Sequence, residues 1–293
     1  MTYIEPVFRP PSEWKSLILQ VTNGCSWNQC SFCEMYTAEQ KRFCPQDLTA
    51  IEAQLRHIVE SGYPVYRVFL ADGDAMTLSV RRLNKIMDML NRWLPNRPRV
   101  SAYCLPRNLR NKSVEQLKEL REKGLSLLYV GCESGDTELL TRIHKGETFD
   151  SSLEALQKMH AAGIKSSVMV LNGLGGPALS RQHALESARL MNAAQPHYLS
   201  TLVVEFPGGT QRFTNAFGPG WRKLNKQELF EEMEVFLQAL QLQNTIFRSD
   251  HASNYLVLKG VLGKDKQQLL ETVRTAIYQP GRIPLREEWQ RGL

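Results

Sequence analysis

The sequence predicts an α/β fold with a mostly parallel sheet. Short apolar or β-branched runs alternate with amphipathic stretches, and successive runs begin about 25 to 50 residues apart. Few charges interrupt these runs, as expected of strands that helices cover on at least one face. An open doubly wound sheet and a partial or complete (β/α) barrel both fit this pattern. In either arrangement the loops at the carboxyl ends of the strands carry the chemistry.

Each predicted element has a local signal. Ser113 and Gln116 have the spacing of a helix capping box, as do Ser151 and Glu154, and three of the predicted helices end on a glycine. The predicted strands are residues 16–22, 67–71, 99–104, 126–131, 166–172 and 198–206. The predicted helices are residues 48–62, 80–93, 113–124, 151–163 and 181–194, with two more near 226–242 and 265–278.

The composition is that of an ordinary globular protein, with 42% hydrophobic and 23% charged residues. Residues 1–15 lack the basic, apolar and small-residue order of a signal peptide. No apolar run approaches the roughly 20 residues that a bilayer requires. We therefore expect a cytoplasmic protein without a membrane partner. In that compartment clustered thiols bind metals or do redox chemistry more often than they form disulfides.

The charge is mildly basic, with a net value of +6. Residues 107–112 form a short basic cluster, RNLRNK, which suits contact with phosphate. No long basic run and no basic patch interleaved with aromatic residues accompanies it. A nucleic-acid partner is therefore possible but not favoured, and a solvated basic face is the simpler interpretation.

Half of the six cysteines lie in one short loop after the first predicted strand. Cys25, Cys30 and Cys33 follow the spacing C-x4-C-x2-C, which lets three thiolates converge on one centre. Thiolate groups of this kind hold zinc or an iron–sulfur cluster. Structural zinc needs a fourth ligand, yet the nearest thiol, Cys44, and the nearest carboxylate, Glu34, lie outside any C-x2-C pair. A thioredoxin-like interpretation of the last two cysteines leaves the first unexplained. A three-cysteine site instead suits a metal cofactor with one exchangeable position.

This loop resembles the cluster-binding loop of the radical S-adenosylmethionine (radical SAM) superfamily. The resemblance implies that Cys25, Cys30 and Cys33 ligate a [4Fe-4S] cluster whose fourth iron is chelated by S-adenosylmethionine (SAM). It also implies that Phe32, just before the last cysteine, lies near the adenine. The common superfamily spacing is C-x3-C-x2-C, so this loop carries one extra residue.

Two further strand ends match the superfamily pattern. Asp72, Gly73 and Asp74 stand where the family often has a Gly-Gly-Glu type motif that bonds the SAM amino group, although a simple Asp-Gly turn explains them too. After the next strand, Ser101 is expected near the rim of the pocket. These residues are therefore candidate SAM contacts.

The fourth strand end resembles one branch of the superfamily. The sequence GCESGD contains Glu133 and Ser134, and it is similar to a stretch of methylthiotransferases, the Elongator catalytic subunit and oxygen-independent coproporphyrinogen oxidase. In that branch a polar residue at the end of this strand contacts SAM. A basic residue, Arg142 or Lys145, meets the SAM carboxylate, and the alternative for both is a solvated helix face.

The fifth strand ends in a glycine-rich turn with Asn172 and Gly173. It lacks the lysine of a P-loop, whereas the resemblance implies close approach of its backbone to the adenine. Tight turn packing is the alternative. Glu205 and residues 247–255 are candidates for a substrate pocket or for polar surface turns. Three cysteines are expected to be buried thiols, namely Cys44, Cys104 and Cys132. The histidines at 57, 144, 160, 183 and 197 receive no role.

The resemblance implies a partial (β/α)6 TIM-like barrel. Residues 1–15 are expected to form an amino-terminal extension, 16–210 the core barrel, and 211–293 a carboxyl-terminal helical extension packed on the barrel. No second cysteine cluster accompanies the first, which argues against a methylthiotransferase. Nothing in the sequence resembles a cobalamin-binding domain.

The implied activity is oxygen-sensitive radical chemistry. One electron, from a donor such as flavodoxin or ferredoxin, cleaves SAM at the cluster to a 5′-deoxyadenosyl radical. That radical abstracts hydrogen from an unidentified substrate, such as a small metabolite, a peptide or a porphyrin-like molecule. No catalytic side chain is assigned. The competing hypothesis is a non-catalytic zinc or iron–sulfur protein that binds nucleic acid.

Overall fold

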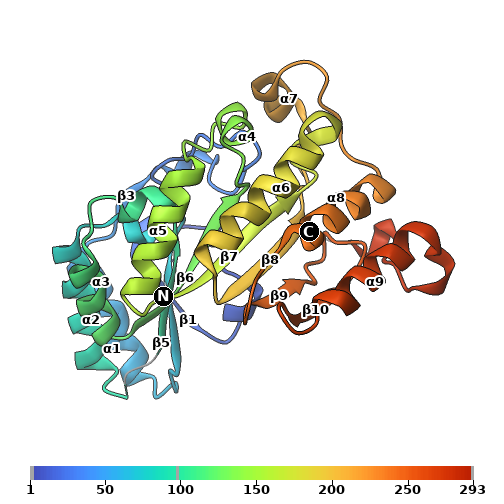
Figure 1. Cartoon of the computed structure of the whole chain (residues 1–293). Helices are drawn as coiled ribbons and strands as arrows, with labels where there is room; N and C mark the ends of the chain where they lie inside the picture. The colour runs from blue at the N-terminus through green and yellow to red at the C-terminus, as the bar shows by residue number, and fades with distance from the viewer. Residues whose placement is uncertain (1–2, 97–98, 292–293) are drawn as a thin grey trace. The chain divides into compact units, whose positions relative to one another are not determined.

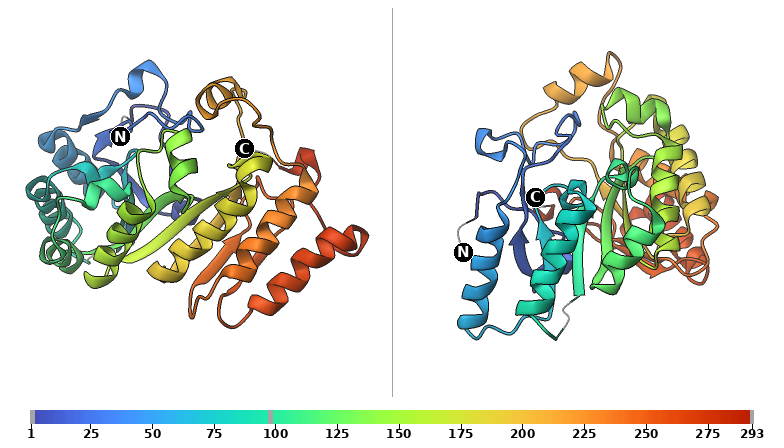
Figure 2. Two further views of the ribbon diagram at one scale, coloured as in Figure 1. Left: turned by 45° about the horizontal axis from the view of Figure 1, so that its top comes forward. Right: turned by 90° about the vertical axis from the view of Figure 1, so that its left-hand side faces the viewer.

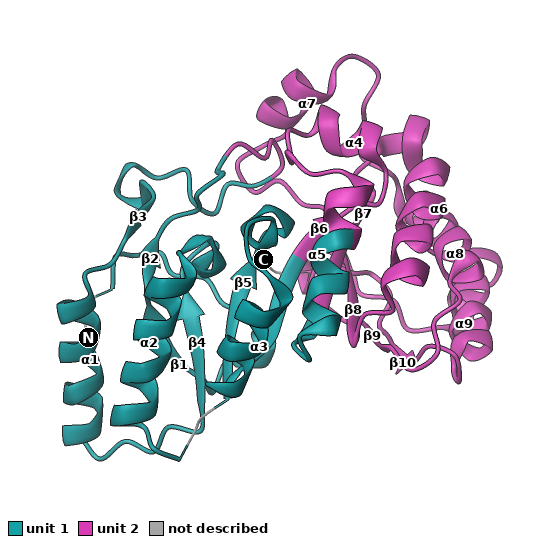
Figure 3. Ribbon diagram, turned by 60° about the vertical axis from the view of Figure 1, so that its left-hand side comes forward, with its two compact units in different colours: residues 1–28, 33–130, 154–166 teal, residues 29–32, 131–153, 167–293 magenta. Residues whose placement is uncertain are grey.

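The computed structural model describes residues 3–96 and 99–291, and it divides into two compact units (Figure 3). Unit 1 comprises Met1–Asn28, Cys33–Val130 and Glu154–Ser166. Unit 2 comprises Gln29–Phe32, Gly131–Leu153 and Ser167–Leu293. Each unit is described by itself below.

Unit 1 contains a parallel sheet with the strand order β1-β4-β5-β6. Helices α1, α2 and α3 lie along one face of β1, β4 and β5 (Figure 3). The strands are β1 (Leu17–Gln20), β4 (Arg67–Ala71), β5 (Arg99–Cys104) and β6 (Leu125–Glu133), whose last three residues belong to unit 2. The helices are α1 (Leu48–Glu60), α2 (Val80–Trp93) and α3 (Val114–Glu122). The cysteine loop is bracketed by a small antiparallel pair, β2 (Thr22–Asn23) and β3 (Cys44–Pro45).

The helices of unit 1 follow from their sequences. Helix α1 starts where the Asp47 side chain accepts a hydrogen bond from the Thr49 N–H, and it buries apolar side chains one turn apart. Ser113 and Gln116 form the predicted capping box of α3, with mutual bonds of 3.0 and 3.2 Å. Inside the unit, the ring of Phe69 lies edge-on to that of Tyr103, 5.1 Å away between centroids.

Unit 2 contains the strand order β7-β8-β9-β10, in which β7, β8 and β9 are parallel and β10 is antiparallel. Helices α6, α8 and α9 lie side by side along these strands, as Figure 1 and the left view of Figure 2 show. The strands are β7 (Lys165–Asn172), which begins in unit 1, β8 (Tyr198–Val203), β9 (Ile246–Ser249) and β10 (Leu258–Val261). The helices are α4 (Thr137–Arg142), α5 (Phe149–Ala161), most of which belongs to unit 1, α6 (Gly176–Ala194), α7 (Gln211–Phe217), α8 (Lys226–Ala239) and α9 (Lys266–Tyr278).

Short 3-10 helices complete the elements in both units. They are η1 (Pro11–Glu13), η2 (Glu39–Lys41), η3 (Ala75–Thr77), η4 (Pro106–Leu109), η5 (Pro280–Arg282) and η6 (Glu288–Gln290). Within the part of the chain that the structure describes, no helix is both long and apolar enough to cross a membrane. None of the six cysteines, all of which are described, forms a disulfide.

The predicted α/β class with a mostly parallel sheet is confirmed, and several element boundaries are corrected. The first predicted strand is split into β1 and β2 because the chain leaves the main sheet after Gln20. Ser151 lies inside α5, and Thr148 is bonded reciprocally to it at the start of that helix. Helix α6 starts five residues before the predicted 181, because Pro177 is tolerated in a first helical turn. The elements β3, β9, β10, α4 and α7 were not predicted. The division into residues 1–15, 16–210 and 211–293 stays a prediction.

Candidate functional site

The three cysteines of the loop fall in both units. Cys25 and Cys33 belong to unit 1 and are partly exposed, whereas Cys30 belongs to unit 2 and is buried, with 9% of its surface exposed. Among residues 3–96 and 99–291, no three His, Cys, Asp or Glu side chains already form a group that could hold a metal ion. The donor chemistry nonetheless fits an iron–sulfur cluster, because three cysteines in one short loop, none of them in a disulfide, supply soft sulfur ligands.

The backbone around Cys25 is packed so closely that only glycine fits beside it. Gly24 has a φ of +67°, and a Cβ on it would lie 1.9 Å from the Lys41 carbonyl oxygen. A Cβ on Gly73 would lie 2.6 Å from the Gly24 oxygen and 2.8 Å from the Cys25 Cα. The turn after β4 therefore holds the start of the cysteine loop in unit 1, which joins two of the predicted site segments.

Asp74 fixes the same loop by hydrogen bonds. Its carboxylate accepts from the Ser26 N–H at 2.8 Å, from the Ser26 hydroxyl and from the Asn108 amide at 3.1 Å. Burial raises the pKa of Asp74, and the bonds from Ser26 and Asn108 partly offset this. Asp74 therefore orients the residue that follows Cys25.

Asp72 forms a fully buried ion pair with Lys41 in unit 1. The Lys41 ammonium also donates to the Ile4 carbonyl at 2.9 Å. The second carboxylate oxygen of Asp72, Oδ1, is buried and has no hydrogen-bond partner among the described residues. That oxygen is therefore a buried acceptor without a described partner. Ser101 is fully buried within β5, and its hydroxyl is 3.5 Å from the Val68 carbonyl.

In unit 2 the segment containing Cys30 and Phe32 lies against the turn after α4. The Ser31 N–H donates to the Ile143 carbonyl at 3.0 Å. The Lys145 ammonium lies 5.7 Å from the centroid of the Phe32 ring. A residue of the cysteine loop and a predicted carboxylate-binding lysine are thus neighbours.

Lys145 is paired with Glu133 in this buried place, with 2.9 Å between Nζ and Oε1. Burial by itself would lower the pKa of Lys145, but the Glu133 carboxylate and the Cys30 sulfur raise it, and the net direction is upward. Arg142 lies instead on the surface, bonded to Glu138 at 2.6 Å and 5.3 Å from the Phe217 ring centroid. Of the two predicted cations, only Lys145 lies beside the loop.

Ser134 belongs to a buried chain of hydrogen bonds in unit 2. Its hydroxyl is 2.8 Å from Nδ1 of His183, whose Nε2 is 3.0 Å from the Leu171 carbonyl. Because a carbonyl only accepts, Nε2 carries the hydrogen and Nδ1 accepts from Ser134. Burial lowers the pKa of His183, which keeps the ring neutral. The histidine thus connects the ends of β6 and β7.

Strand β7 ends at Asn172, and Gly173 begins the turn that follows. Gly173 has a φ of +80°, and its N–H donates to a carboxylate oxygen of Glu232 at 2.7 Å. Asn172 is buried, and its side-chain Oδ1 has no partner among the described residues. As with Asp72, an unpaired buried oxygen lies at a predicted SAM contact.

A pocket of about 260 Å³ opens beside the carboxyl ends of β7 and β8 in unit 2. Glu205 lines it and is paired with Lys223, at 2.9 Å, and with Arg291. Asn254 instead holds β8, since its amide donates to the Thr201 carbonyl at 2.8 Å and accepts from Val203 at 2.9 Å.

The other thiols differ from one another. Cys104 and Cys132 are buried as predicted, but Cys44 is exposed because it lies in the short β3 strand, away from the main sheet. Burial raises the pKa of Cys132 to about 12, so this thiol stays protonated at neutral pH.

The sequence did not predict a role for two residues that contact the ends of β6 and β7. His183 received no role, and Glu232 lies 59 positions from its partner Gly173. A weak signal existed for the histidine, because Ser180, His183 and Ser187 share one face of α6 at helical spacing.

Residues 19–191 match the Radical SAM superfamily family model, and the chain therefore belongs to the radical SAM superfamily. Among curated proteins it is similar to the heme chaperone HemW of Bacillus subtilis (strain 168). The two are 30% identical over 222 residues, which are 72% of this chain and 56% of HemW. The chain spans about half the length, or less, of the curated relatives it matches.

Two solved structures show the fold. Coproporphyrinogen III oxidase (HemN) from Escherichia coli aligns with a TM-score of 0.60 at 17% identity, covering 76% of this chain and 52% of that one. Methylornithine synthase (PylB) aligns with a TM-score of 0.52 at 17% identity, covering 88% and 68%. The predicted superfamily, the partial-barrel fold class and the likeness to the coproporphyrinogen oxidase type are confirmed. Membership of this superfamily implies a [4Fe-4S] cluster and SAM, the cofactors predicted from the sequence.

Proposed function

We propose that the protein cleaves SAM reductively and abstracts a hydrogen atom from its substrate. Cys25, Cys30 and Cys33 are the proposed cluster ligands, and a flavodoxin or ferredoxin is the proposed electron donor. When bound, the cluster and SAM supply a 5′-deoxyadenosyl radical as the hydrogen-abstracting group. The chain's own part is to place the substrate next to that group and to exclude water and oxygen.

The observation that supports this best is the buried Lys145 beside the segment of Cys30 and Phe32. The lysine keeps its proton because Glu133 and the Cys30 sulfur raise its pKa against the effect of burial. A fixed ammonium next to the loop suits the carboxylate of SAM, and the Phe32 ring suits its adenine. Arg142, bonded to Glu138 on the surface, is the weaker candidate for that role.

The other predicted SAM contacts would act through side-chain acceptors or through the backbone. Asp72 and Asn172 each present an unpaired buried oxygen. Gly73, Asp74, Ser134 and Gly173 act through turn geometry and the bonds described above. Ser101 has the least support, because its hydroxyl lies against the Val68 carbonyl of the neighbouring strand.

The substrate that we propose to test first is porphyrin-like. HemW is named a heme chaperone and HemN a coproporphyrinogen III oxidase, and these two relatives share the superfamily of this chain. A second candidate function is binding of haem itself, which the 30% identity to HemW favours. The two differ in outcome, since one chemically changes the ligand and the other returns it intact.

The test is anaerobic. The protein is reconstituted with iron and sulfide, reduced with dithionite and given SAM, and 5′-deoxyadenosine is measured by mass spectrometry. Addition of haem or coproporphyrinogen III is expected to raise the rate or to yield a changed porphyrin. A brown protein that binds haem but releases no 5′-deoxyadenosine would support the second candidate and contradict the first.

A further inference from the structure

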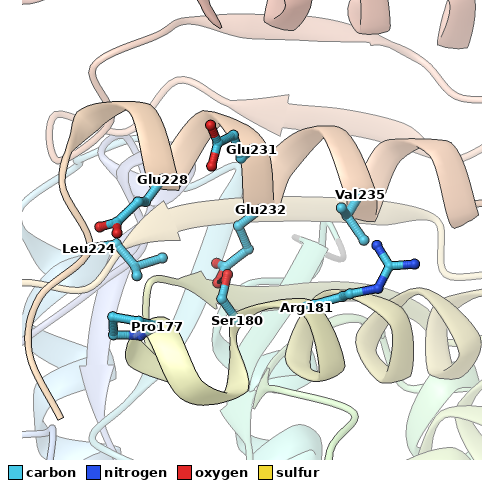
Figure 4. Close-up of a pocket in the computed structure, with 8 residues that line it drawn as sticks. All are labelled: Pro177, Ser180, Arg181, Leu224, Glu228, Glu231, Glu232 and Val235. Atoms are coloured by element: carbon cyan, nitrogen blue, oxygen red, sulfur yellow. Dashed lines mark hydrogen bonds between the residues drawn. The ribbon is translucent and has the colours of Figure 1, made fainter. Parts of the chain in front are cut away.

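The carboxyl-terminal helix α8 reaches into the turn after β7 through one buried side chain. Glu232 is 3% exposed, and its two carboxylate oxygens accept from the Gly173 N–H and from the Ser180 hydroxyl, each at 2.7 Å. Figure 4 shows Glu232 directed from α8 toward Ser180 on α6. We infer that Glu232 is a positioning residue for SAM, because it holds the Gly173 turn in place. This inference rests on the proposed function.

A carboxylate is costly in such a place unless donors surround it. Among the described residues, the Gly173 N–H and the Ser180 hydroxyl are the neutral donors to Glu232, and the ring of the neighbouring His183 is held neutral by burial. Nε2 of His183 lies 3.9 Å from the carboxylate and already donates to the Leu171 carbonyl. Burial raises the pKa of Glu232, which the neighbouring His183 and the bonds from Ser180 and Gly173 oppose. The side chain is therefore retained in the core by its bonds to the turn.

The turn needs support from outside because glycine makes it flexible. Gly173 has a φ of +80°, where other residues are strained, and glycine adopts many other conformations equally well. Leu229, one turn before Glu232 on α8, is the nearest side chain to the missing Cβ, at 3.0 Å. One helix thus packs against Gly173 and accepts its N–H, which selects a single turn conformation.

Glu232 is not an isolated contact. Ser180 and His183 lie on α6, and His183 bonds the Ser134 hydroxyl at the end of β6 and the Leu171 carbonyl in β7. Residues of α6 and α8 therefore hold two strand ends that carry predicted SAM contacts. Helix α8 (Lys226–Ala239) lies beyond residues 19–191, the part that matches the family model. The carboxyl-terminal part of this chain thereby becomes part of the cofactor site.

Three variants isolate the role. Glu232→Asp keeps the charge but moves the carboxylate away from the Gly173 N–H. Glu232→Leu removes the acceptor altogether. Glu232→Gln keeps an acceptor of the same length without the charge. Glu231→Gln is the matched control, because Glu231 is exposed on the same helix and accepts from Gln227 at 2.9 Å. The dissociation constant of SAM is measured by anaerobic calorimetry on the cluster-loaded proteins, alongside unfolding by urea.

We expect SAM to bind about tenfold more weakly to Glu232→Asp and Glu232→Leu, as one unsatisfied buried donor implies. Glu232→Gln and Glu231→Gln should bind within about threefold of the wild type. The KM for SAM should rise more than kcat falls. Because Glu232→Asp keeps a carboxylate and removes a single methylene, it tests the inference even if Glu232→Leu fails to fold.

The measured SAM affinities test the role of Glu232 separately from the proposed cleavage of SAM. Folded Glu232→Asp protein that binds SAM as tightly as the wild type would overturn the inference alone. So would equal weakening in Glu232→Asp and Glu232→Gln, since the neutral acceptor would then not rescue binding. A wild-type protein that carries the cluster and does not bind SAM would overturn the proposed function, and this inference with it.

Discussion

The Lys145 ammonium lies 2.9 Å from the Glu133 carboxylate, and both side chains are buried at the end of β6. Glu133 takes a φ of +64°, a left-handed conformation that is uncommon for a residue with a side chain. The ion pair thus sits at a strained position beside the segment of Cys30 and Phe32. Strain of this kind is concentrated at functional sites, which agrees with a role in cofactor binding.

Removal of the lysine alone should be destabilising. Lys145→Met leaves the Glu133 carboxylate buried without its partner, which costs about 3 to 5 kcal/mol in the free energy of unfolding. The double variant Glu133→Gln/Lys145→Met should recover most of that loss, because no buried charge remains. Urea denaturation of the three proteins measures this. Equal stability of the single and double variants would contradict the assignment of a buried pair.

Gly73→Ala should disturb cluster loading. The new Cβ would lie within 2.9 Å of the Cys25 backbone and side chain, so the start of the cysteine loop must move. We expect less iron and sulfide per chain after reconstitution, measured by absorbance and metal analysis. Gly281→Ala is the control, because no atom lies within 4 Å of its Cβ position and it should load normally. Normal loading of Gly73→Ala would refute the packing argument.

His183 should make the stability fall on acidification. Burial lowers its pKa in the folded protein, so below the ordinary value of 6.5 the unfolded chain takes up a proton that the folded chain resists. The free energy of unfolding therefore decreases as the pH falls below 6.5, by at most about 1.4 kcal/mol per pH unit. The effect should be absent in His183→Gln.

Glu232, the carboxylate near His183, changes the stability with pH in the opposite direction. Burial raises the pKa of Glu232, so its contribution to stability increases as the pH falls through the folded pKa toward 4.5. His183 lowers the pKa of Glu232 in turn, so the difference between wild type and His183→Gln reports the histidine together with its effect on Glu232. Urea denaturation at pH 7.5 and 5.5 measures that difference. Parallel pH dependence in the two proteins would show that His183 is not held neutral.

Local signals in the sequence predicted much of the fold. The capping box of Ser113 and Gln116 depends on residues three apart, and the apolar runs of β4 and β5 depend on burial of contiguous residues. The short strands β9 and β10 have only four residues each and lie among polar residues, so no pattern separates them from loops. Strand β9 depends on pairing with β8, and β10 depends on pairing with β9, which are tertiary effects.

The sequence likewise predicted the local parts of the candidate site and missed those that depend on tertiary packing. The cysteine spacing and the order of the strand-end motifs are visible in the chain, because each is a short local pattern. The bond between Glu232 and Gly173 joins residues 59 positions apart, and it exists because α8 packs beside α6. Likewise, nothing in the sequence says that Lys145 is buried and Arg142 exposed. Burial depends on which face each side chain presents after folding.

Cys30 is a proposed cluster ligand, and Cys44 is not. Cys30→Ala should lose the brown chromophore and stay folded, whereas Cys44→Ala, which changes an exposed thiol outside the loop, should keep both. Visible absorbance measures the cluster, and circular dichroism in the far ultraviolet measures the fold. A full cluster in Cys30→Ala would show that the wrong ligands were chosen.

The most direct test of the central claim is 5′-deoxyadenosine formation by these same proteins under dithionite and SAM. Wild type and Cys44→Ala should release 5′-deoxyadenosine, and Cys30→Ala should release none above the protein-free background. Release by Cys30→Ala at the wild-type rate, or no release by a cluster-loaded wild type, would contradict the claim that this loop supports reductive cleavage of SAM.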